Sequence, residues 1–191
     1  MLRLIAAALA EHQVETEVVR AVDLDLRPGV SSDEGDGDDW PDVRAKVLAA
    51  QILVLGTPIW LGNPSSVCRR VLERMDAFLG ETDPSGRMVT TDRVAVAATV
   101  GNEDGAHNVS AQVFQALDDL GFTIPAGGHA YWVGQAMGSV DFKDLEPVPG
   151  RVIETVSVLG RNAAHLARAL QAQPYPGRPG HPGPGSSTHS D

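Results

Sequence analysis

Two short, continuous apolar runs constrain the fold of this chain most strongly. One covers residues 51–56, Gln-Ile-Leu-Val-Leu-Gly, and the other covers residues 93–100, Arg-Val-Ala-Val-Ala-Ala-Thr-Val. Uninterrupted runs of this length are typical of strands that are buried on both faces of a parallel sheet. Each run is followed by a stretch with helical spacing, which is the crossover that parallel strands require. The two runs therefore predict an α/β open parallel sheet with helices on both faces.

The remainder of the chain continues this alternation. We expect helices over residues 2–10, from Trp40 onward, over 64–80, 106–120 and 152–170, because apolar side chains recur there at helical spacing. Asn63 and Pro64 suit the N-cap and first position of the third of these helices. Further strands are expected over 14–19, 122–124 and 129–133. Residues 1–173 should form one domain, whereas 174–191, rich in Pro, Gly, Ser and His, read as a disordered tail.

Composition excludes several classes of partner. Fifteen basic and 25 acidic side chains give a net charge of −10, which repels nucleic acid and anionic membrane surfaces. The single cysteine, Cys68, allows no internal disulfide and no cysteine-based metal cluster, and we expect it to be a small buried hydrophobe. No signal peptide or membrane-spanning run is recognisable, so a cytoplasmic location is expected.

Two loops that follow the apolar runs are candidates for chemistry. Ligands of open parallel sheets bind beyond the carboxyl ends of the strands. Residues 57–65, Thr-Pro-Ile-Trp-Leu-Gly-Asn-Pro-Ser, offer an aromatic wall and free N–H donors at a helix start. Residues 99–106, Thr-Val-Gly-Asn-Glu-Asp-Gly-Ala, let the backbone approach a ligand through two glycines. The alternatives are an ordinary strand-to-helix connection with Trp60 packed on the core, and plain turn chemistry at 101–105.

Both loops resemble those of one family. The 57–66 segment, followed by a helix that carries Arg69, Arg70 and Glu73, resembles the second flavin loop of the NADPH-dependent FMN reductase-like branch of the flavodoxin superfamily. The 101–107 segment resembles the third flavin loop, and the likeness in element order extends over about residues 2–176. The resemblance implies a flavodoxin-like fold, bound FMN, NAD(P)H as electron donor and a homodimer. The implied cofactor-binding residues are Thr57, Pro58, Ile59, Trp60, Leu61, Gly62 and Asn63 in one loop, and Thr99, Gly101, Asn102, Glu103 and Gly105 in the other.

The first strand of that family, with its Ser/Thr-rich phosphate loop, has no counterpart here, since the sequence begins inside what resembles the first helix. In the flavodoxin-like strand order 2-1-3-4-5 this strand is internal, and its absence leaves a gap of about 9.6 Å between its neighbours. We therefore expect the true start to lie upstream. A version extended upstream should be far more stable, and equal thermal midpoints of the two versions would contradict this expectation.

The resemblance implies an enzyme that passes hydride or electrons from NAD(P)H through FMN to a small-molecule acceptor such as a quinone or a flavin. FMN itself performs this chemistry, so no catalytic side chain is assigned. A flavodoxin-type electron carrier and a flavin-free interaction module are the alternatives. The acidic 33–39 stretch lacks the terminal Glu of a calcium loop, and no metal site is expected. His107 is expected on a helix surface, with contact to a substrate as the alternative. Tyr131 and Trp132 are expected in the core, with stacking near the ligand as the alternative.

Overall fold

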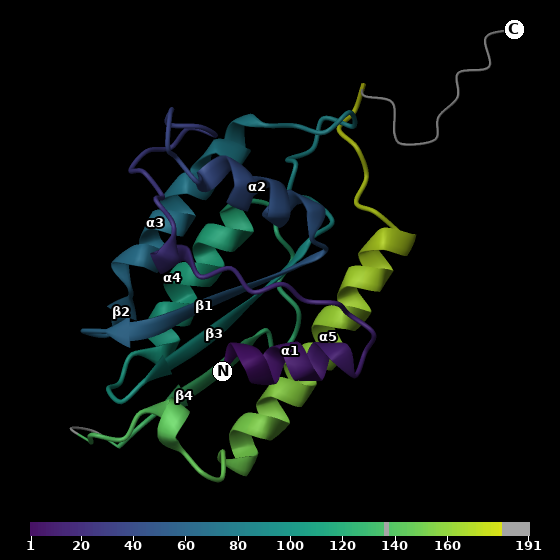
Figure 1. Cartoon of the computed structure of the whole chain (residues 1–191). Helices are drawn as coiled ribbons and strands as arrows, with labels where there is room; N and C mark the ends of the chain where they lie inside the picture. The colour runs from purple at the N-terminus through teal and green to yellow at the C-terminus, as the bar shows by residue number, and fades with distance from the viewer. Residues whose placement is uncertain (136–137, 181–191) are drawn as a thin grey trace, which may run out of the picture.

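The computed structural model describes residues 1–135 and 138–180 of the chain (Figure 1). Within these residues, five α-helices and four strands follow one another, with short 3-10 turns between them. The helices are α1 (Leu2–Ala10), α2 (Trp40–Ala49), α3 (Ser66–Met75), α4 (Ala106–Asp119) and α5 (Gly150–Ala172), and the strands are β1 (Ile52–Trp60), β2 (Asn63–Pro64), β3 (Val94–Gly101) and β4 (His129–Val133). The 3-10 turns are η1 (Ala21–Asp23), η2 (Asp76–Gly80) and η3 (Phe142–Asp144). In the described part of the chain, no helix is long and apolar enough to cross a bilayer.

The strands form one sheet in the order β2-β1-β3-β4. β1 and β3 are parallel, with Ile52 opposite Val94 and Pro58 opposite Val100, and β4 runs parallel to β3 on its other side. β3 is buried along most of its length and consists mainly of alanine and valine, whose small side chains let helices pack on both of its faces. The predicted parallel sheet is confirmed, although the 122–124 stretch contributes a single bridge rather than a strand.

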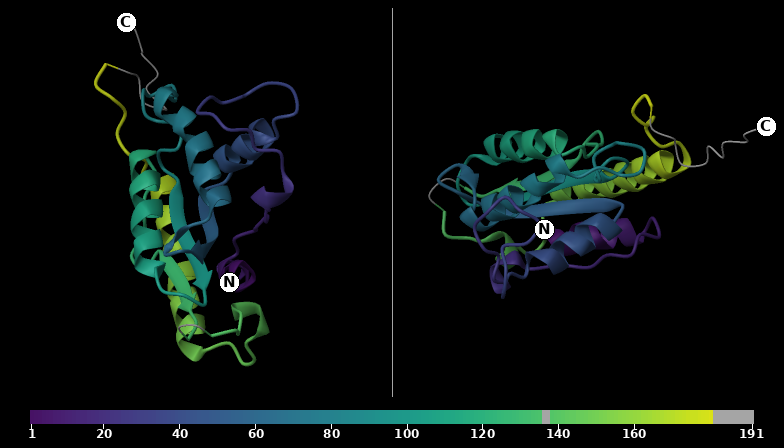
Figure 2. Two further views of the ribbon diagram at one scale, coloured as in Figure 1. Left: turned by 90° about the vertical axis from the view of Figure 1, so that its left-hand side faces the viewer. Right: turned by 90° about the horizontal axis from the view of Figure 1, so that it is seen from above.

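Helices cover both faces of the sheet, as Figure 2 shows. α2, α3 and α4 pack on one face around Trp40, Met75 and Phe78, and α1 and α5 pack on the other around Ile5, Leu9 and Leu159. The α1 and α5 helices lie against each other. Ala8 is so close to Gly160 that a Cβ at position 160 would lie 3.0 Å from the Cβ of Ala8. All five predicted helices are present.

The predicted strand at 14–19 is wrong. These residues form an irregular segment between α1 and η1, and Val18 and Val19 are exposed. The physical reason lies at the sheet edge. Within the described residues, β1 has a parallel neighbour only on its β3 side, and on the other side β2 pairs only with the last two residues of β1, Ile59 and Trp60. A strand must lie within about 4.8 Å of a partner to pair, so the alternating pattern of 14–19 is not sufficient by itself. The existence of an upstream strand stays a prediction.

The acidic loop before α2 is organised by a buried ion pair rather than being simply solvated. Asp38 and Arg74 of α3 are both inaccessible to solvent, and Arg74 Nη2 donates to Asp38 Oδ2 at 2.7 Å. Arg74 also donates to the backbone oxygens of Arg27 and Ser31. Burial alone raises the pKa of Asp38, but the N–H donors of Glu34 and Trp40 together with Arg74 outweigh it and hold that pKa below its ordinary value. These hydrogen bonds from Arg74 therefore hold the 27–40 segment against α3.

Part of the predicted tail contacts the domain. Tyr175 N donates to Asp92 Oδ1 at 2.8 Å, its carbonyl oxygen accepts from Arg87 Nη1 at 2.7 Å, and Arg178 N donates to the oxygen of Ser85 at 3.0 Å. Residues 174–178 thus bind the 83–92 connection, at the end of the sheet opposite the β1–β2 hairpin (Figure 1). Residues 181–191 lie outside the described residues.

The buried ion pair generates a stability prediction. Asp38→Ala leaves the Arg74 guanidinium buried without a carboxylate, so we expect the free energy of unfolding in urea to fall by about 3–5 kcal/mol. Lys46→Ala breaks the exposed Lys46–Glu17 pair and is the matched control, with an expected loss below about 1 kcal/mol. Similar small losses for both variants would contradict the structural importance of the buried pair.

Candidate functional site

The first predicted loop is a β-hairpin, because β1 continues through residues 57–60. Trp60 pairs with Asn63, and Ile59 pairs with Pro64, so Leu61 and Gly62 form a two-residue turn. Both turn residues have positive φ, +50° and +72°, as a type I′ turn requires. The predicted N-cap at Asn63 is wrong for the same reason: Ser65 caps α3, and its hydroxyl accepts from Cys68 N at 3.2 Å.

The hairpin tip is tied to the second loop and to α4. Leu61 N donates to Glu103 Oε1 at 2.6 Å, Asn108 Nδ2 donates to the oxygen of Gly62 at 2.8 Å, and Gln112 Nε2 donates to Asn63 Oδ1 at 3.2 Å. Glu103 belongs to the second loop, whereas Asn108 and Gln112 lie one turn apart on α4. The two predicted loops are therefore neighbours in space and are held together at several points.

Two glycines allow this close approach. A side chain at Gly105 would place its Cβ 2.6 Å from the Cα of Gly62, and the φ of +128° at Gly105 also disfavours other residues. A Cβ at Gly101 would lie 2.8 Å from the Cβ of Ile59. The glycine spacing of the 101–105 stretch thus serves the contact between the loops.

The predicted site residues divide into buried and exposed groups. Thr57, Ile59 and Thr99 are buried in the sheet, so their side chains face the protein interior. Trp60 is 64% exposed and Leu61 is 89% exposed, which excludes the alternative that Trp60 packs on the core. Pro58 is exposed too, and the others are half-buried around the two loops: Gly62, Asn63, Gly101, Asn102, Glu103 and Gly105. The structure brings all twelve to one end of the sheet.

An aromatic cluster beside the second loop escaped the sequence analysis. The His129 ring stacks on Tyr131, with centroids 5.1 Å apart, and His107 meets Tyr131 edge-on at 5.2 Å. A hydrogen bond of 2.7 Å joins His129 Nε2 to Thr99 Oγ1. Burial, assisted by the nearby His107, lowers the pKa of His129 to about 4, so this imidazole is neutral near pH 7. The sequence signal that could have revealed this cluster is the spacing of His129 and Tyr131, because residues two apart on a strand lie on the same face of the sheet.

Two core assignments from the sequence have different outcomes here. Tyr131 is 39% exposed and does not belong to the core, because β4 is an edge strand with an open side in the described residues. Trp132 faces the opposite side of the sheet and packs on Phe142.

His107 is exposed in the first turn of α4, as predicted for a helix surface. Cys68 is buried as predicted, and burial raises the pKa of its thiol, so it is a poor nucleophile.

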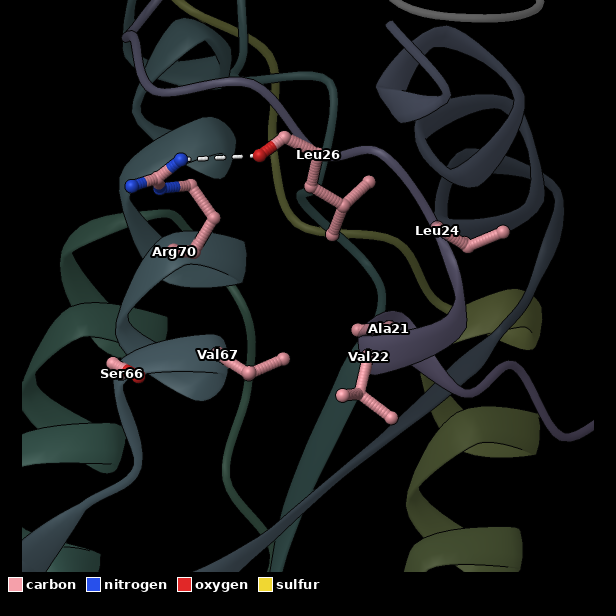
Figure 3. A pocket seen from close by; sticks show the side chains of 7 residues that line it. All are labelled: Ala21, Val22, Leu24, Leu26, Ser66, Val67 and Arg70. Atoms are coloured by element: carbon pink, nitrogen blue, oxygen red, sulfur yellow. Dashed lines mark hydrogen bonds between the residues drawn. The ribbon is translucent and has the colours of Figure 1, made fainter.

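A groove of about 250 Å³ lies between α3 and the 21–26 segment (Figure 3). Valine and leucine side chains line much of it, and Arg70 Nη1 donates across it to the oxygen of Leu26 at 3.1 Å. Its volume is below the range of about 300–1,000 Å³ that is usual for ligand pockets. We therefore place no cofactor in this groove.

The two loops fit the ring system of a flavin better than they fit its phosphate. The exposed indole of Trp60 supplies a flat apolar surface, and the glycines let a ring approach the backbone. The hydroxyl groups of Thr57 and Ser65 hydrogen bond to each other, so neither points freely at a phosphate. Among the described residues, the α1 N-terminus carries no side-chain cap, which leaves backbone N–H groups as its anion-binding donors.

An open sheet of parallel strands with helices on both faces and two candidate loops beyond the strand ends is the architecture of flavodoxin-like proteins. Residues 1–138 match the NADPH-dependent FMN reductase family, and the chain belongs to that family. The predicted fold class and family resemblance are thereby confirmed.

Relatives of known name are similar over most of this chain. It is 34% identical over 177 residues to 8-demethyl-8-aminoriboflavin-5′-phosphate synthase of Streptomyces davaonensis, covering 85% of this chain and 67% of that protein. It is 35% identical over 180 residues to the divalent metal cation transporter MntH of Mycobacterium bovis, covering 90% of this chain but only 26% of the transporter. The crystal structure of RosB with bound 8-demethyl-8-formylriboflavin-5′-phosphate superposes with a TM-score of 0.81 at 29% identity, covering 91% of this chain and 73% of that chain.

The close approach of the loops predicts an effect of Gly105→Ala. The added Cβ meets the backbone of Gly62, so we expect the hairpin to be displaced and the free energy of unfolding to fall by about 1–3 kcal/mol. Gly80→Ala is the matched control, because no atom lies within 4 Å of the position that its Cβ would take. Chemical denaturation of both variants measures the difference, and equal stabilities would contradict the tight contact.

The neutral His129 predicts a pH-dependent stability. Its pKa of about 4 in the folded state lies below the unfolded value of about 6.5, so below pH 6.5 the unfolded chain takes up the proton first. The stability is complete above pH 6.5 and falls toward pH 4, by about 2 kcal/mol from this group once solvent screening of the partly exposed ring is allowed for. We expect His129→Gln to lose less stability than the wild type between pH 7 and 4.5, whereas His165→Gln, the control, replaces an exposed histidine of α5 outside this cluster and should follow the wild type.

Proposed function

We propose that this protein is an FMN-dependent oxidoreductase that passes electrons from NAD(P)H to a small-molecule acceptor such as a quinone or a free flavin. The observation that carries the proposal is the rigid hairpin with an exposed Trp60, tied to a glycine-rich second loop at the ligand-binding end of the sheet. Membership of the FMN reductase family supports the flavin assignment. We further propose a homodimer in the cytoplasm.

In this proposal the protein would position FMN, which when bound would supply hydride and electron transfer between NAD(P)H and the acceptor. Trp60 and Leu61 would hold the ring system, and Asn102 and the backbone of Gly101 and Gly105 would hold its polar edge. Thr57, Ile59 and Thr99 act from within the sheet, by fixing where the loops begin. The neutral His129 adds no positive charge next to the second loop, which keeps this side of the site suitable for uncharged rings.

A direct test measures FMN binding by flavin fluorescence quenching and NAD(P)H oxidation by the loss of its near-ultraviolet absorbance. We expect Trp60→Ala to weaken FMN binding about tenfold, because an aromatic stacking contact contributes about 0.5–1.5 kcal/mol beyond burial. Trp60→Phe is the matched control and should retain most of the affinity. A well-folded protein that binds no FMN would refute the proposal and favour the flavin-free interaction module.

A second candidate is an enzyme for which FMN is the substrate and is chemically modified. The 34% identity to a synthase of 8-demethyl-8-aminoriboflavin-5′-phosphate favours it. The two candidates share the ring site and differ in the fate of FMN. Mass spectrometry of FMN recovered after aerobic incubation with an amino-group donor, with and without NAD(P)H, distinguishes them: unchanged FMN supports the oxidoreductase, and a product altered at the ring supports the modifying enzyme.

A further inference from the structure

The carboxylate of Glu103 joins two segments that lie 42 residues apart. Its Oε1 accepts the hydrogen bond from Leu61 N at 2.6 Å, which is short even for a bond to a charged acceptor. Leu61 is the first residue of the hairpin turn, and Glu103 lies half-buried in the second loop. This bond therefore connects the tip of one predicted flavin loop to the centre of the other.

The hairpin turn needs such a contact because packing does not hold it. Leu61 has a φ of +50°, a conformation that costs a leucine about 1–2 kcal/mol, and its side chain is almost fully exposed. Trp60 beside it is mostly exposed as well. The other groups that bind the hairpin, Asn108 and Gln112, are neutral amides, so Glu103 supplies the charged member of the set.

We infer that Glu103 is a positioning residue that holds the Leu61–Gly62 turn in place and that its charge makes the site prefer oxidised over reduced flavin. The inference rests on the proposed function. Two electrons and one proton, supplied by NAD(P)H or by a chemical reductant, add one negative charge to the flavin ring system. The Glu103 carboxylate, held between the loops by a solvent-exposed hydrogen bond, opposes that charge, because salt screens charges only in part at separations below the Debye length of about 8 Å. None of the side chains bonded to the hairpin tip is a cation that would cancel it, within the part of the chain that the structure describes.

Three variants separate the two parts of this inference. Glu103→Gln removes the charge but keeps an oxygen that can accept from Leu61 N. Glu103→Ala removes both the charge and the acceptor. Asp104→Asn is the matched control, because it removes a charge one residue away whose carboxylate accepts from Gly105 N at 2.7 Å rather than from the hairpin.

Hydrogen exchange of the Leu61 amide, which donates to Glu103, tests the positioning role without any flavin. We expect exchange at this amide to be at least tenfold faster in Glu103→Ala, to change less in Glu103→Gln, and to match the wild type in Asp104→Asn. Unchanged exchange in Glu103→Ala would overturn the positioning role.

The dissociation constants for oxidised and dithionite-reduced FMN test the effect of the charge. We expect Glu103→Gln to favour the reduced form at least tenfold more than the wild type does, which raises the two-electron midpoint potential by about 30 mV. Asp104→Asn should shift this ratio by less. An unchanged ratio in Glu103→Gln would overturn the electrostatic part, whereas a wild type that binds neither form would refute the proposed function and leave the exchange measurement to decide the positioning role.

Discussion

The parallel pairing of β1 with β3 is the contact on which the rest of the structure depends. Its register runs from Ile52 opposite Val94 to Pro58 opposite Val100, so both strands end at the same edge of the sheet. Each strand end begins one of the two candidate loops, and the pairing thereby sets their separation. Helices pack on both faces of this pair and bury β3 along most of its length. The strand ends therefore have little freedom to shift.

The helices of one face then fix the loops in detail. α4 presents Asn108 and Gln112 to the hairpin, while α3 presents Arg70, Glu73 and Arg74 to the 26–38 segment. Gln112 lies four residues after Asn108, and Glu73 and Arg74 lie three and four residues after Arg70, so each set projects from one side of its helix. In both places, polar side chains on a packed helix therefore bind backbone or side-chain atoms of the neighbouring irregular segment. This arrangement gives the candidate site a rigid tip without requiring that tip to be buried.

The side chains at the site are suited to ligand binding rather than to acid–base catalysis. The one cysteine is buried with a raised pKa, and the partly buried imidazole of His129 is neutral near pH 7 because its pKa is lowered. An exposed indole and glycine-lined backbone favour a flat ring with polar edges, which agrees with membership of an FMN reductase family. The Glu103 carboxylate, which accepts a hydrogen bond from the hairpin, places a negative charge between the two loops.

The sequence by itself determined the strands 52–56 and 94–100, the five helices and the neighbourhood of the two loops, because apolar periodicity and the geometry of parallel sheets are local or topological rules. It did not reveal the hairpin, since a Leu-Gly turn lacks the usual Asn-Gly or Asp-Gly signal. The fate of 14–19, the burial of Asp38 against Arg74 and the exposure of Tyr131 were decided only by the tertiary structure. Each depends on what lies beside it in space: 14–19 lacks a pairing partner, Asp38 meets a counter-charge 36 residues away, and Tyr131 lies at an open sheet edge. No local sequence pattern records those neighbours.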